Sequence, residues 1–221
     1  NINAGAAVDI ASNENSSATP WSIVIDDTIV DCSSLSGRWV GVLGDSDYST
    51  DRFCVMKYEA QNVAGVPKSE DNGTPWSAIN YSDARTACQS LDGQGYESPD
   101  LISNAQWMTI AANAANVATN WQNGVVGSGA LNVGHTDSSP GNLLQAPSQP
   151  GTGEIADWCL GTGQTCSQSV WNSQRRAHSL ADEAVIWDLA GNLNEWVHYN
   201  EPIGKVADQG SFEYPALVDG N

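Results

Sequence analysis

The segment VIWDLAGNLNEWVHY, residues 185–199, places an acidic, glycine-containing turn between Trp187 and Trp196. The apolar run VIW is typical of a buried strand, but such a strand would not be followed at once by Asp188 and, seven residues later, by Glu195. A chain with this segment must fold so that several oxygen-bearing side chains are held beside large apolar rings. We therefore expect the turn to have a structural or binding role.

The size and composition of the chain indicate one folded domain. Its 221 residues are enough to bury a hydrophobic core. Hydrophobic residues make up 40% of it and nine are tryptophan, which excludes a mainly disordered chain. Abundant Gly, Ser and Asn favour a loop-rich extracellular module over a helical enzyme. We divide the chain into an extended arm, 1–20, and a single domain, 21–221.

The charge of the chain is strongly negative. It has 26 acidic and 8 basic residues, for a formal net charge of -18. Such a surface repels phosphate backbones, so the sequence predicts no nucleic-acid partner. Attraction of cations and simple solubility remain two open explanations of the charge.

Five cysteines point to an oxidising compartment. None shows the CxxC spacing of a zinc site, so disulfides are expected. Cys159 and Cys166 bracket a glycine-rich loop, and we predict a local bridge between them. The odd count leaves one thiol, which is either free and buried or waits for a partner in another chain.

The sequence contains no run of eighteen apolar residues, so no membrane-spanning segment is expected. The first residues, NINAGAAVDIASNENSS, resemble a mature N-terminus left after removal of a targeting segment. We therefore expect a secreted or cell-surface protein.

Alternating and β-branched residues predict strands in the first quarter of the chain. The stretch 21–32, WSIVIDDTIVDC, is typical of a strand or hairpin, and 37–44 of a short strand. The strongest signal is 52–60, RFCVMKYEA, where alternate residues fall on two faces.

Helical spacing follows in two places. The run 82–91 predicts a helix capped by Ser82 or Asp83, and 104–121 predicts a second one. The next stretch, 122–174, is rich in Gly, Ser, Asn and Pro, and its tryptophans favour an ordered loop region.

Six segments, taken in order, resemble the formylglycine-generating-enzyme-like family, or sulfatase-modifying-factor family. They are FCVMKYEA, TPWSAINYSDARTACQSLDGQGYESP, NAQWMTIAANAANVATNW, VGSGALNVGHTD, QRRAHSL and VIWDLAGNLNEWV. The resemblance covers roughly residues 52–198. It implies an α+β, C-type-lectin-like fold with two helices, small twisted antiparallel sheets and long ordered loops. The match is closer still to secreted bacterial members, some of which carry type IV pilin-like anchors.

The resemblance also implies a structural calcium ion in the acidic turn. Its ligands would be the side chains of Asp188 and Glu195 and the carbonyls of Gly191 and Leu193. Ca²⁺ takes six to eight such oxygens, and glycine permits a tight turn. The alternative is a turn whose Asp and Asn side chains accept from backbone N–H groups. Under either interpretation, we expect both flanking tryptophans to pack into the core.

The enzymatic chemistry of the family is not expected here. Its catalytic cysteine pair lies after the Glu-Trp motif, whereas no cysteine follows Cys166. A second enzymatic branch holds iron with clustered histidines, but His135, His178 and His198 are scattered along the chain. Arg175 and Arg176 match a family stretch and are predicted to form structural ion pairs.

The family continues after the Glu-Trp motif with strands that return to pair with the FCVMKYE region. Only 201–221 follows here, so we expect an exposed edge at 52–60. Three alternatives stay open: the tail 201–221 folds back as a substitute, another subunit donates a strand, or the sequence is incomplete. We also expect Cys54 to be the cysteine left without a partner.

Three functions remain in view. The first is a non-catalytic, exported structural or adhesive subunit of a pilus-like assembly, with other protein subunits as partners. The second is a ligand-binding display or receptor module whose ligand the sequence does not name. The third, a metal-dependent oxidoreductase, requires the three histidines to converge.

Overall fold

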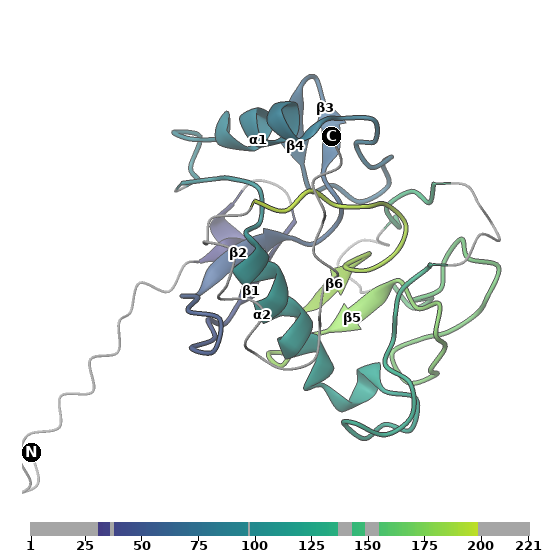
Figure 1. Ribbon diagram of the computed structural model, residues 1–221. Coiled ribbons are helices and arrows are strands. Elements are labelled where there is room, and N and C mark those ends of the chain that lie inside the picture. The colour runs from purple at the N-terminus through teal and green to yellow at the C-terminus, as the bar shows by residue number, and fades with distance from the viewer. Residues whose placement is uncertain (1–30, 36–37, 97, 137–142, 149–154, 199–221) are drawn as a thin grey trace, which may run out of the picture.

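The computed structural model describes residues 31–35, 38–96, 98–136, 143–148 and 155–198. The arm predicted for 1–20 and the first ten residues of the strand or hairpin predicted for 21–32 lie outside these ranges, as does the tail from 199. The described end of that segment is not a strand, because Cys32 begins a 3-10 helix. The described part is a mixed α/β structure with two α-helices and three small antiparallel sheets of two strands each (Figure 1). The coarse fold prediction, two helices with small antiparallel sheets, is thus confirmed.

The first sheet joins β1, Trp39–Val42, to β2, Phe53–Met56. Both strands were predicted, although each is shorter than its apolar segment. In β1 the side chains of Val40 and Val42 are buried while the alternate residues are partly exposed, as expected for a strand with one face on the core. A 3-10 helix, Cys32–Ser34, lies beside β1 and is capped by the Asp31 side chain.

The other two sheets are short hairpins. The strands β3, Gln61–Val63, and β4, Val66–Lys68, pair around a turn at Ala64 and Gly65, both with positive φ. The strands β5, Ala177–Ser179, and β6, Val185–Trp187, are buried at every residue.

Helix α1, Tyr81–Gln89, and helix α2, Asn104–Ala115, confirm the two predicted helices. The cap predicted for α1 is wrong: the N-cap is Asn80, whose side chain accepts from the N–H of Asp83. Asp83 is the donor here because the helix begins one turn earlier than its apolar positions suggest. At α2, Ser103 and Gln106 form a reciprocal capping box.

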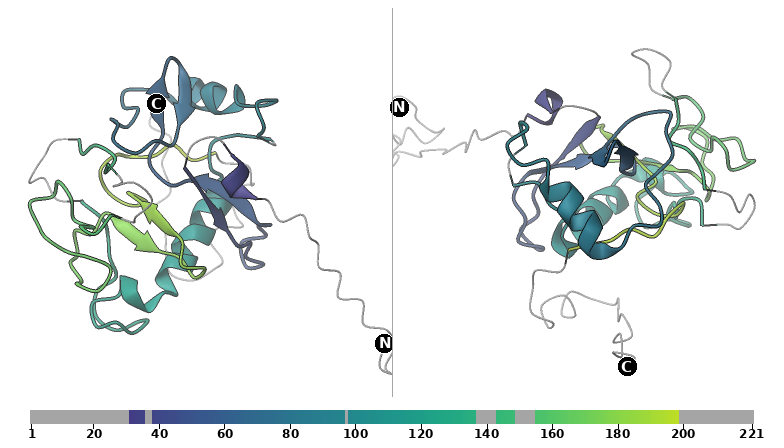
Figure 2. Two further views of the ribbon diagram at one scale, coloured as in Figure 1. Left: turned by 180° about the vertical axis from the view of Figure 1, so that it is seen from behind. Right: turned by 90° about the horizontal axis from the view of Figure 1, so that it is seen from above.

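Helix α2 packs across the two sheets that form the main core. Its Ile110 and Ala114 contact Val40 and Val42 of β1 and Ile186 of β6. Figures 1 and 2 show α2 between the β1–β2 and β5–β6 hairpins, with α1 beside β3 and β4. Between α2 and β5 the described chain holds one short 3-10 helix, Ala118–Asn120, and ordered loops in which Trp158 is buried.

The structure contains two disulfides. The predicted Cys159–Cys166 bridge is confirmed. The prediction that Cys54 lacks a partner is wrong, because Cys54 is bonded to Cys32. Gly41 opposite Cys54 leaves room for this bridge, since a Cβ there would lie 3.3 Å from the Cys32 sulfur. The free cysteine is Cys88 on α1.

Candidate functional site

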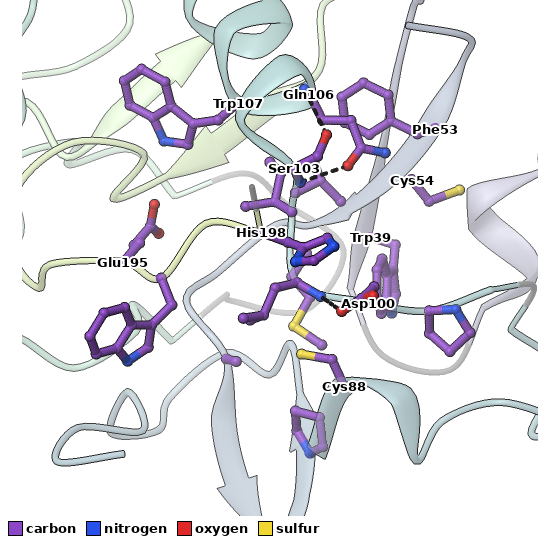
Figure 3. A pocket seen from close by; sticks show the side chains of 18 of the residues that line it. Trp39, Phe53, Cys54, Cys88, Asp100, Ser103, Gln106, Trp107, Glu195 and His198 are labelled. Carbon is purple, nitrogen blue, oxygen red and sulfur yellow. Dashed lines mark hydrogen bonds between the residues drawn. The ribbon is translucent and has the colours of Figure 1, made fainter. Parts of the chain in front are cut away.

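An open cleft of about 1290 Å³ runs along β2. Its walls are β2, the loop 75–79, the cleft-facing side of α1, the first turns of α2 and the segment 193–198 (Figure 3). The volume exceeds the roughly 300–1,000 Å³ of a usual small-molecule pocket. The cleft can therefore accommodate a longer, extended ligand.

The backbone of β2 offers hydrogen-bonding groups to this cleft. The N–H of Lys57 donates to the carbonyl of Arg38 at 3.0 Å, so Arg38 and Lys57 form a hydrogen-bonded pair. Opposed residues in an antiparallel ladder alternate between bonded and non-bonded pairs. With Val40 opposite Val55 and Gly41 opposite Cys54, the bonded pairs fall at Val55 and Phe53. The N–H and C=O groups of Cys54 and Met56 therefore point away from β1.

The side chains of β2 are also incompletely covered. All four residues, Phe53–Met56, are partly exposed, whereas every residue of β5 and β6 is buried. The sequence FCVM is as apolar as VIW, so composition does not explain the difference. Among the described residues, β2 pairs with β1 alone. These side chains line the open cleft, which leaves them partly accessible.

Hydrogen bonds from His198 hold two walls of the cleft together. Its N–H donates to the Ile102 carbonyl at 2.7 Å, and its own carbonyl accepts from Asn104 at 3.1 Å. Its ring nitrogen Nδ1 lies 2.7 Å from the Tyr81 hydroxyl on α1. The segment 193–198 is thereby fixed to the start of both helices, which gives the cleft a preformed shape.

The prediction that both tryptophans of the acidic turn enter the core is half wrong. Trp187 is 2% exposed, but Trp196 is 49% exposed. Trp196 lies at the cleft, packs edge-on against Tyr81, and donates its indole N–H to the Ile79 carbonyl at 2.9 Å. The apolar character of Trp196 predicted burial, whereas its place on an open cleft leaves the ring accessible.

Two carboxyl groups of the cleft have raised pKa values. Burial, and then the charges of Asp188 and Glu195, raise the pKa of Glu59 to about 8. Its Oε2 accepts from Asn192, while its buried Oε1 has no hydrogen-bond partner within the described structure. Glu195 is an exposed residue of the cleft by its surface area, while desolvation of its carboxyl group by neighbouring atoms raises its pKa to about 7.

Asp188 has a different role from the one that the family resemblance implies. Both of its carboxylate oxygens accept from Arg176, Oδ1 from Nε at 2.8 Å and Oδ2 from Nη2 at 2.6 Å. A guanidinium that covers both oxygens does not suit a calcium ligand. The prediction that Arg176 forms a structural ion pair is thereby confirmed. Arg175 instead lies over the Trp158 ring and donates to the carbonyls of Thr119 and Gln168.

The remaining residues of the acidic turn show why it is tight. Gly191 has φ +86°, and a Cβ on it would lie 2.4 Å from the His135 carbonyl oxygen. Asn192 accepts from the N–H of Leu144 at 2.8 Å, which is the backbone-capping role considered as the alternative to calcium. Calcium coordination by Gly191, Leu193 and Glu195 stays a prediction. The Asp188 carboxylate, which is paired with Arg176, does not fit the role of a calcium ligand. Within the described ranges, no three His, Cys, Asp or Glu side chains form a group that could hold a metal ion.

The three histidines contact different parts of the chain. His135 lies 3.0 Å from the Gln174 side chain, His178 3.3 Å from the Asn132 carbonyl, and His198 against Tyr81. His178 is buried on β5, and desolvation lowers its pKa to about 4. Each imidazole therefore has a local structural partner.

We compared the chain with protein-family models, curated proteins and solved structures. None of them matches it. The cleft, the carboxyl pair and the free edge of β2 must therefore be interpreted from their own geometry.

Sequence reasoning predicted an exposed edge at 52–60, and among the described residues β2 pairs with β1 alone. It missed Glu59, the third acidic group near the turn. Glu59 ends the same apolar segment, on the face shared with Phe53 and Val55. An acidic residue on the apolar face of a predicted strand indicates a carboxyl group that is partly buried, and this pattern could have identified Glu59. Its proximity to Asn192, 133 positions away, carries no signal in the local sequence.

Proposed function

We propose that the protein is a non-catalytic, exported structural or adhesive subunit that associates with other protein subunits at the cell surface, in a pilus-like assembly. The observation that carries this proposal is the free edge of β2 in an open cleft. An unpaired strand edge is a template on which an extended segment of another chain can add by backbone hydrogen bonds. Side-chain pockets along the cleft would then select the segment.

One feature of the described structure supports the location. Its two disulfides are compatible with an extracellular protein. Within the described ranges, no helix is sufficiently long and apolar to cross a bilayer. The mixed architecture, with β6 leading into the turn at Gly191, supports a C-type-lectin-like fold of the formylglycine-generating-enzyme type as part of the same proposal.

A second candidate is a ligand-binding display or receptor module. The exposed Trp196 favours it, because an accessible tryptophan beside a preformed cleft is typical of recognition surfaces. The size of the cleft and the free backbone groups of Cys54 and Met56 favour an extended polypeptide over a small ligand. We therefore rank subunit association first.

Imaging the native protein as it leaves the cell, together with light scattering, tests the proposal. We expect multi-subunit particles or filaments. A strictly monomeric species at all concentrations would refute subunit association and favour the receptor module.

A matched pair of variants on α1 connects assembly to the cleft. Ala87 is partly buried and lines the cleft, whereas its neighbour Thr86 is exposed and does not line it. Ala87→Trp should fill the cleft and abolish association, while Thr86→Trp should leave association unchanged. Circular dichroism confirms that both variants are folded. Equal assembly by the two variants would contradict a role for the cleft.

A further inference from the structure

The cleft constrains the kind of segment that can fill it. An added strand must be extended, must offer backbone groups to Cys54 and Met56, and must cover apolar side chains with an apolar face of its own. This inference rests on the proposed function, which requires the segment to come from another subunit. The question is which chain supplies it.

Residues 21–30, WSIVIDDTIV, have the required pattern. In an extended conformation, alternate residues share a face. One face carries Trp21, Ile23, Ile25 and Ile29, together with Asp27. The opposite face carries only two apolar residues, Val24 and Val30. In an extended conformation, the segment would thus have one strongly apolar side.

The single acidic residue on the apolar side also has a possible counterpart. Arg52, immediately before β2, is the one basic side chain among the described residues that line the cleft. An added antiparallel strand with Asp27 opposite Arg52 would place Ile25 and Ile23 along β2. Charge complementarity of this kind sets register more than it adds affinity.

We propose that residues 21–30 of a second copy of this chain occupy the cleft as a strand beside β2, with Trp21, Ile23, Ile25 and Ile29 facing into it. Ten extended residues span about 33 Å, more than the roughly 13 Å of the four residues of β2. The segment is therefore long enough to run along the whole strand and beyond it.

The position of Asp31 indicates how contacts between a donor segment and a cleft could repeat from one subunit to the next. Asp31 lines the cleft and directly follows the donated segment, and the neighbouring Cys32 is fixed to β2 by its bridge to Cys54. Each subunit thus presents its donor segment from a fixed point and accepts the segment of the next subunit in its own cleft. Donor and acceptor are different surfaces, so the contact is heterologous and can continue into an open filament.

The free thiol of Cys88 serves as a built-in reporter. Cys88 lines the cleft, and because burial raises the pKa of its thiol to about 11, little thiolate is present near neutral pH and the cross-linking is followed over a long reaction time. The variants Ile23→Cys and Ile25→Cys, made in the full-length chain and treated with a short bis-maleimide, should form covalent dimers and higher multimers. Adding Cys88→Ser should abolish these products. Ser16→Cys, outside the donor segment, is the matched control and should give at least tenfold less product.

The outcomes separate this inference from the proposed function. Intermolecular products that depend on Cys88 support donation by a second copy. An intramolecular product shows that the segment fills its own cleft, and this overturns the inference. If the wild-type chain assembles but no product depends on Cys88, the donor assignment fails while subunit association stands. If the wild-type chain is strictly monomeric, the proposed function is refuted, and the donor assignment that rests on it is refuted as well.

A charge substitution tests which face of the donor is buried. Ile25→Asp should reduce association at least tenfold, because a carboxylate would enter an apolar cleft. Asp26→Asn, on the opposite face, should leave association within about twofold. Equal effects of both substitutions would overturn the assignment of the buried face.

Discussion

Arg176 and Asp188 form a fully buried, two-pronged ion pair that connects β5 to the end of β6. The guanidinium also donates to the carbonyls of Leu160 and Gln145, at 2.8 and 2.9 Å. One side chain thus satisfies acceptors from three loop segments that have no regular structure of their own. The pair organises the loop-rich half of the molecule.

Removing one member of this pair should be costly. Arg176→Met leaves the Asp188 carboxylate buried without its partner, which typically costs about 3–5 kcal/mol. The matched variant is Arg85→Met, which removes a pair with Asp100 that is about one-third exposed. Such surface pairs contribute roughly 0–1 kcal/mol. Urea unfolding measures both, and similar losses for the two variants would contradict the structural role of Arg176.

The local parts of this structure follow from the sequence. β-Branched alternation predicts β1 and β2, and helical spacing predicts α1 and α2. The Cys159–Cys166 bridge follows from short spacing across a glycine-rich loop. In each case, the decisive residues lie within a few positions of one another, so periodicity and turn chemistry are sufficient.

The long-range parts do not follow from the sequence. Cys32 pairs with Cys54 because two strands and a 3-10 helix bring them together, which spacing alone does not reveal. The family resemblance implies calcium at Asp188, whereas the cationic group that Asp188 meets is Arg176, twelve positions earlier. In an acidic chain, many carboxylates compete for few partners, and the fold decides between them.

The two disulfides should differ in their contribution to stability. Bridging constrains the unfolded chain more when the closed loop is longer. The sequence separations of 22 for Cys32–Cys54 and 7 for Cys159–Cys166 predict losses of about 3 and about 2 kcal/mol when both cysteines of a bridge become serine. Thermal unfolding of the two double variants tests the order. A larger loss at the shorter loop would show that native packing outweighs the loop term.

Gly191 should tolerate no side chain. Gly191→Ala combines a strained positive φ with a Cβ that meets the His135 carbonyl oxygen. Gly93 also has positive φ, at +74°, but a Cβ there has nothing within 4 Å. Gly93→Ala should therefore cost about 1 kcal/mol and Gly191→Ala at least about 2 kcal/mol more. Equal costs, measured by urea unfolding, would mean that the turn can move away from His135.

Glu59 should make stability fall as pH rises. Its pKa is about 8 in the folded chain, against 4.5 for an unperturbed glutamate carboxyl. Between these values the folded state binds more protons than the unfolded state, so the free energy of unfolding decreases from pH 4.5 to 8. Above pH 8 the free energy of unfolding is reduced by the full cost of burying the ionised Glu59, because its carboxylate is then charged in a poorly solvated site.

Glu59→Gln removes this titration while keeping the shape of the side chain and an acceptor for Asn192. The variant should be more stable than the wild type by about 1–3 kcal/mol at pH 9, and the difference should disappear near pH 4. Urea unfolding across this range measures it, with Glu183→Gln, an exposed acid, as the matched control. If added Ca²⁺ reduces the difference at pH 9, the cation stabilises the ionised Glu59 carboxylate, which would add Glu59 to the ligands that the family resemblance implies. A variant that loses stability at pH 9 would show instead that the Glu59 charge is held by a favourable partner.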